Sequence, residues 1–101
     1  KRYEGTKNTD KDSYIYYIPE ESSDNIYLVC DITEYDTTAV GDKGIEVYVN
    51  DKLIGNIDSK GTTKLKIGYV SGDELLTVKF HADNAEYTLY SISLDKGQAE
   101  T

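Results

Sequence analysis

The single histidine of the chain, His81, is the first side chain whose type could support catalysis. An imidazole oriented by a carboxylate can act as a general base, and Asp83 follows two residues later. Residues two apart on a strand share a face without necessarily touching, and no motif fixes a nucleophile near them. We therefore interpret His81 as a solvated histidine on an outer sheet face.

A second candidate is a calcium site near the N-terminus. Asn8, Asp10 and Asp12 have the alternate spacing that opens a calcium-binding loop. The rest of that motif is missing, because Ser13 stands where the loop needs glycine and Pro19 where it needs a bidentate glutamate. A looser calcium site built from loop carboxylates has no specific signature here, and its candidate ligands are Asp36, Asp42 and Asp73.

Cys30 is the only cysteine, and it lies among Ile26, Leu28 and Ile32 on the expected inner face of a strand. A buried thiol has a raised pKa and is unreactive, so Cys30 is predicted to pack in the core. The chain also lacks a glycine-rich phosphate loop, the His/Cys spacing of metal sites and the GxSxG motif. The sequence therefore predicts a domain that is not an enzyme, with no catalytic residue, no cofactor and no metal ligand set.

Tyrosine is the unusual component of the chain, with ten residues against one Phe and no Trp. Tyr27, Tyr48 and Tyr87 are predicted to face outward and form a candidate ligand face. Rings on a sheet face can stack on the apolar faces of sugars, while nearby Asn, Asp and Lys bind the hydroxyl groups. The alternative is that these rings simply cover a half-buried sheet.

The elements that position these residues are strands, because period-two alternation dominates and no helical repeat appears. Strands are predicted at 13–20, 25–33, 44–49, 52–57, 62–70, 75–82 and 86–95. Short turns join most of them, and Asn50-Asp51 suits a type I′ hairpin turn. The sequence predicts one all-β domain, an antiparallel β-sandwich that is jelly-roll-like. It spans residues 13–96, after a flexible polar lead-in at 1–12 that could include an edge strand, and before a polar tail at 97–101.

The alternation also assigns side chains to faces. Inward residues are predicted to be Ile26, Leu28, Cys30, Ile32, Ile45, Val47, Val49, Leu65, Ile67, Tyr69, Leu76, Val78, Phe80, Tyr90, Ile92 and Leu94. Outward residues are predicted to be Tyr27, Glu46, Tyr48, Lys64, Lys66, Lys79, His81 and Tyr87.

Composition excludes several classes of partner. The 101 residues include 19 acidic and 11 basic side chains, a net charge of −8. Nucleic acid and anionic membrane surfaces both need clustered basic residues, so neither is expected to bind. No apolar run approaches the ~20 residues that span a bilayer, so this chain is not expected to insert into a membrane. One cysteine leaves the compartment open, and a start at Lys-Arg without Met suggests a piece of a longer protein.

The stretches IEVYVNDKLIGNI, LKIGYVSGDELLTVKFHAD and YTLYSISLD resemble the extracytoplasmic β-domain of YfhO-type bacterial membrane proteins. The resemblance runs in order over roughly residues 25 to 95. One departure is Asp51, where the family pattern prefers glycine. The matching residues are Val47-Tyr48-Val49-Asn50, Leu53-Ile54-Gly55, Ile67-Gly68-Tyr69-Val70, Gly72-Asp73-Glu74 and Val78.

The resemblance implies a part of a multi-pass, lipid-linked sugar transferase of Gram-positive bacteria, associated with glycosylation of cell-envelope polymers. The family's catalytic acidic residues lie in loops of the membrane part, and none of those positions exists in this chain. The resemblance therefore implies a non-catalytic accessory domain, extracytoplasmic and at the cell surface. Its partners would be a cell-envelope glycopolymer or the membrane part of the parent protein.

Two other functions stay open from the residues themselves. The outward tyrosines favour a carbohydrate-binding or adhesin-type module of a secreted surface protein. A purely structural spacer would bind no ligand.

Overall fold

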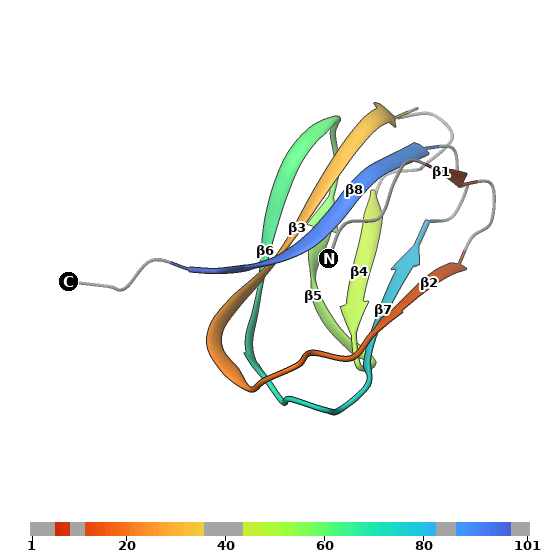
Figure 1. The fold of residues 1–101 in the computed structure, drawn as a ribbon. Helices are drawn as coiled ribbons and strands as arrows, with labels where there is room; N and C mark the ends of the chain where they lie inside the picture. The colour runs from red at the N-terminus through yellow and green to blue at the C-terminus, as the bar shows by residue number, and fades with distance from the viewer. Residues whose placement is uncertain (1–5, 9–11, 36–43, 83–86, 98–101) are drawn as a thin grey trace.

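The computed structural model describes residues 6–8, 12–35, 44–82 and 87–97. These residues form two antiparallel four-stranded sheets packed face to face (Figure 1). They contain no helix, and therefore none long and apolar enough to cross a membrane. The predicted all-β antiparallel sandwich is confirmed. The strands are β1 (Thr6–Asn8), β2 (Asp12–Tyr17), β3 (Ser23–Tyr35), β4 (Ile45–Val49), β5 (Lys52–Ile57), β6 (Gly61–Val70), β7 (Leu76–His81) and β8 (Tyr87–Lys96).

The topology is that of a jelly roll. The first half of the chain pairs with the second half in reverse order, β1 with β8, β2 with β7, β3 with β6 and β4 with β5. Alternate pairs lie in opposite sheets, which gives the strand orders β1-β8-β3-β6 and β2-β7-β4-β5. The β3–β8 and β4–β7 ladders complete the two sheets. A long hairpin folded over itself in this way buries one face of every strand pair.

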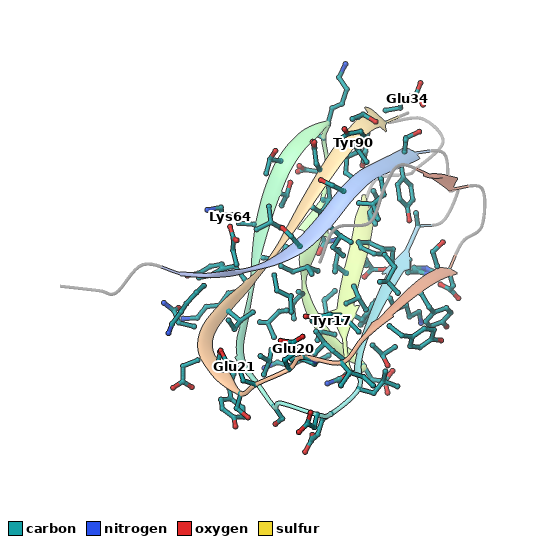
Figure 2. The ribbon with its side chains drawn as sticks, viewed as in Figure 1. Tyr17, Glu20, Glu21, Glu34, Lys64 and Tyr90 are labelled. Atoms are coloured by element: carbon teal, nitrogen blue, oxygen red, sulfur yellow. The ribbon has the colours of Figure 1, made fainter. Side chains whose placement is uncertain are left out.

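The core fills the space between the sheets, as the alternation predicts for β3, β4 and β7. Cys30, Ile45 and Val47 are completely buried. Ile15, Ile67 and Leu94 are partly buried and pack against this core. Outward assignments hold as well for Lys64 and Lys66, which are exposed, and Lys64 extends away from β6 (Figure 2).

The inward and outward assignments on β8 are wrong for two tyrosines. Asp31 pairs with Ser91 and Ile32 with Leu89, so Tyr90 is an extra residue in the ladder. Such a β-bulge reverses the alternation on either side of it. Tyr87, predicted to face outward, is therefore buried at 2% exposure, and Tyr90, predicted to face inward, is 42% exposed.

The inward prediction for Tyr69 on β6 is also wrong, because β6 contains a second bulge. Tyr27 pairs with Lys66 and Ile26 with Gly68, so one residue of β6 is skipped. Gly68 has a positive φ of 94°, which favours glycine. The reversal places Val70 in the core and leaves Tyr69 61% exposed instead of inward.

The loops at one end of the sandwich are tied together. Asn50 and Asp51 have φ values of 49° and 69°, which confirms the predicted type I′ turn between β4 and β5. The Asn50 backbone N–H donates to the Thr77 carbonyl oxygen at 2.9 Å, and the Thr77 N–H donates to the Asn50 side-chain Oδ1 at 2.9 Å. The β6–β7 loop binds the β2–β3 loop, because the Asp73 N–H donates to the Pro19 carbonyl oxygen at 2.8 Å. Figure 1 shows these three connections at the same end.

Some strands extend beyond the ranges predicted from the sequence. Within the expected lead-in, Thr6–Asn8 forms β1, which pairs with β8. Strand β3 begins at Ser23, two residues before its predicted start. The rest of the lead-in up to residue 11 and the tail from 98 onward lie outside the described residues.

Candidate functional site

The three tyrosines predicted to share a ligand face do not lie on one surface. Tyr27 belongs to β3 and Tyr48 to β4, which are in opposite sheets, so their outward faces point away from each other. Tyr87 is in the core. Of the predicted face, only Tyr48 remains on the outer side of the β2-β7-β4-β5 sheet.

The surroundings of Tyr27 support the alternative interpretation, that its ring covers the sheet. It is half-buried and lies against Gly97, close enough to leave no room for a Cβ there. Its neighbours in register are Lys66 and Asp95. The ring is therefore used in packing the end of β8 onto β3.

Two other tyrosines, both on β2, stand beside Tyr48 on its sheet. Tyr14 is 50% exposed and Tyr16 is 59% exposed. Their ring centroids lie 6.3 Å apart, and the ring planes differ by only 6°. Ile15 packs against the core, so its two neighbours on the strand must face outward. SYIYYIPE has apolar residues on both faces, so its alternation alone does not show which face is inward. Neither Tyr14 nor Tyr16 is among the tyrosines that the sequence predicts to form the ligand face.

Strand register joins Tyr14 and Tyr48 into one row across the sheet. Tyr14 pairs with Lys79, which also pairs with Tyr48, so the two tyrosines lie two strand spacings apart, about 10 Å. The Lys79 ammonium lies 5.3 Å from the centroid of the Tyr48 ring, a cation–π contact. We call this set the aromatic row, and its members are Tyr14, Lys79, Tyr48 and Leu53.

A row of hydrogen-bonding side chains runs beside the aromatic row. His81 Nδ1 lies 2.5 Å from Asp12 Oδ1, and both side chains are partly exposed. Glu46 pairs with His81 and lies beside Tyr48, whose hydroxyl is 3.5 Å from Glu46 Oε2. We call this set the polar row, and its members are Asp12, His81, Glu46 and Asn56. The two rows together with Tyr16 are the tyrosine face.

His81 contacts a carboxylate on the neighbouring strand. Its predicted location on an outer face is confirmed, and among the described residues the carboxylate of Asp12 contacts it. The carboxylate considered from sequence, Asp83, lies outside the described residues. The pair is therefore a cross-strand contact made by the β2–β7 ladder, at one end of the polar row.

The described residues offer little else for chemistry. They contain no group of three His, Cys, Asp or Glu side chains placed to bind a metal ion. Asp10, Asp36 and Asp42, considered as calcium ligands, lie outside the described residues. Cys30 is completely buried, which confirms its predicted place in the core, and burial raises the pKa of its thiol to about 12.

A groove opens between the edge strands β5 and β6, near the tied loops. Its volume is about 270 Å³, and its apolar lining includes Ile54, Ile67 and Leu75. Glu74 and Lys52 contribute charged groups of opposite sign. The groove is separate from the tyrosine face, because it lies at the side of the sandwich and not on the outer surface of a sheet.

No protein-family model, curated protein or solved structure matches the chain. The interpretation of the tyrosine face therefore rests on its geometry, and the resemblance to YfhO-type domains rests on the quoted motifs alone.

Proposed function

We propose that this chain is a non-catalytic binding module that holds carbohydrate on its tyrosine face. The observation that carries the proposal is the exposed pair Tyr14 and Tyr16, whose ring planes are nearly parallel. Exposed rings of common orientation offer flat apolar surfaces to the C–H faces of sugar rings. Contiguous exposed apolar surface on a soluble protein commonly marks a binding site.

The polar row supplies the second requirement of carbohydrate binding. Sugars carry many hydroxyl groups, which need hydrogen-bonding partners when they leave water. The carboxylates of Asp12 and Glu46, the imidazole of His81 and the amide of Asn56 stand beside the rings and can accept or donate these bonds. Stacking and hydrogen bonding are thus available on one face.

The test is binding to a panel of purified polysaccharides, with alanine variants of the rings. Tyr14→Ala and Tyr16→Ala are each expected to weaken binding about 2- to 10-fold, the equivalent of one aromatic contact. The matched control is Tyr90→Ala, which removes an exposed tyrosine from the opposite sheet (Figure 2). A control that loses as much affinity as Tyr16→Ala, or a panel without a single ligand, would overturn the proposal.

We also propose that the module is an extracytoplasmic, cell-surface accessory part of a larger envelope protein, as its resemblance to YfhO-type glycosyltransferases implies. The support is the order of the shared motifs. In the structure those motifs fall where the backbone is constrained, since Gly68 and Asp73 have positive φ and Gly72 has no room for a Cβ against the Glu21 backbone.

In that setting the partners of the module would be a cell-envelope glycopolymer or the membrane part of the parent protein. The experiment is to sequence the gene around this segment and to plot the hydropathy of the flanking regions. Several apolar spans of ~20 residues each would support the membrane-bound parent. A parent with a signal peptide and soluble tandem domains would replace it with a secreted surface protein, and one lacking both would refute the surface location.

A further inference from the structure

We infer that the tyrosine face binds an internal segment of an uncharged glycan chain, at least two sugar units long, and not a free sugar or a chain end. This inference rests on the proposed carbohydrate function and adds to it the length, the charge and the part of the polymer that is recognised. It follows from three features of the face: its extent, its open ends and its charges.

The extent of the face exceeds a single sugar ring. Tyr14 and Tyr16 are separated by 6.3 Å between centroids, and Tyr48 stands about 10 Å from Tyr14 across the sheet. One pyranose ring can cover one tyrosine ring. A ligand that uses all three rings must therefore contain several linked sugars.

The ends of the face are open because both rows run from one edge strand to the other. β2 and β5 are the outermost strands of this sheet, and the aromatic row begins at Tyr14 on β2 and ends at Leu53 on β5. A chain that lies along the row leaves the sheet at both edges. Recognition of a chain end needs a pocket around the terminal sugar, and the groove near Leu75 lies away from this face.

The charges of the face disfavour an anionic polymer. The Lys79 ammonium, the one lysine of the face, lies over the Tyr48 ring, and the Asp12 carboxylate, which contacts His81, carries the opposite charge. The carboxylate of Glu46 adds a negative charge beside them, and the whole chain carries a net charge of −8. A polyanion would be repelled by this field, whereas a neutral chain loses nothing.

The test is to measure, by titration calorimetry, the affinity for defined oligosaccharides of one to six units prepared from neutral glucan, mannan and xylan. Polygalacturonate is the anionic comparison. Affinity is expected to rise at least 10-fold between one and four units of a bound series and then to level off. Reduction of the terminal sugar with borohydride is expected to leave the affinity of the six-unit chain unchanged. Polygalacturonate is expected to bind more weakly than the neutral chains.

Variants separate the positions of the sugars along the face. Tyr14→Ala is expected to weaken binding of both short and long chains, whereas Tyr48→Ala should matter only for chains long enough to reach β4. Equal affinity for one and six units, loss of binding on end reduction, or tighter binding of polygalacturonate would overturn the inference while the carbohydrate function stands. Absence of binding to every member of the panel would overturn both.

Discussion

Replacement of Tyr87 by alanine tests the β-bulge that sets the faces of β8. Simple alternation along YTLYSISLD places Tyr87 on the outside and Tyr90 in the core, and the structure reverses both positions. The two tyrosines lie on the same strand, three residues apart. They therefore form a matched pair in which only the side of the sheet differs.

The expected magnitudes follow from burial. A buried aromatic side chain removes ~200 Å² from water, and at ~25 cal/mol per Å² this contributes about 5 kcal/mol. Truncation of large aromatic residues in cores costs about 3–5 kcal/mol of unfolding free energy, and we expect Tyr87→Ala to fall in that range. Tyr90→Ala removes an exposed ring and is expected to cost less than about 1 kcal/mol.

The assay is urea unfolding followed by circular dichroism, with the midpoint and slope fitted for each variant. A third variant, Tyr87→Phe, keeps the ring and is expected to cost only about 1 kcal/mol, so it remains measurable if Tyr87→Ala does not fold. A Tyr87→Ala protein within about 1 kcal/mol of the parent, or a Tyr90→Ala protein as unstable as Tyr87→Ala, would show that the bulge is misplaced and that the alternation continues unbroken.

Three further predictions concern the hairpin, a glycine and the thiol. Asn50→Ala is expected to lower the unfolding free energy by about 1–2 kcal/mol, because it removes the side-chain hydrogen bond to β7 and places alanine at a positive φ. Asp51→Gly in the same turn should not lower it. Equal losses of unfolding free energy for the two variants in urea would contradict the type I′ turn. Gly44→Ala is expected to lower the unfolding free energy by more than about 2 kcal/mol, since its φ is 70° and a Cβ would lie 2.6 Å from a backbone oxygen. The control is Gly55→Ala, whose Cβ would meet only a movable leucine side chain. A lower melting temperature for Gly55→Ala than for Gly44→Ala would refute this account. Cys30 should resist a thiol reagent at pH 8 until urea is added, and because its pKa rises on folding from 9.0 to about 12, its contribution to stability is present below pH 9 and is lost as the pH rises toward 12. Rapid labelling of the native protein would contradict the burial of this thiol.

Local sequence was sufficient wherever one strand alone decides the outcome. Alternation in NIYLVCDIT, IEVYV and LTVKF places apolar side chains on one face of each strand, and those side chains are in the core. The Asn50-Asp51 turn follows in the same way, because both residue types tolerate positive φ. An all-β sandwich results from these features, since each strand has one face to bury.

The bulges could not be located from one strand. A bulge is a mismatch between two paired strands, so its position depends on the partner as much as on the residue that is skipped. Tyr90 and Tyr69 have no local feature that distinguishes them from inward residues, although Gly68 beside Tyr69 permits the positive φ that the structure uses. One skipped residue reverses all assignments beyond it, which is why Tyr87 was placed on the wrong face.

The candidate site was decided by sheet membership. Alternation predicts that Tyr27 and Tyr48 each leave a strand on its polar side, and this much the residues determine alone. Only the long-range pairing of β2 with β7 and of β7 with β4 brings Tyr14 beside Tyr48, and only the placement of β3 in the other sheet removes Tyr27 from them. The physical reason is that the pleat of a strand fixes the direction of its side chains, whereas its neighbours are chosen by the packing of the whole core.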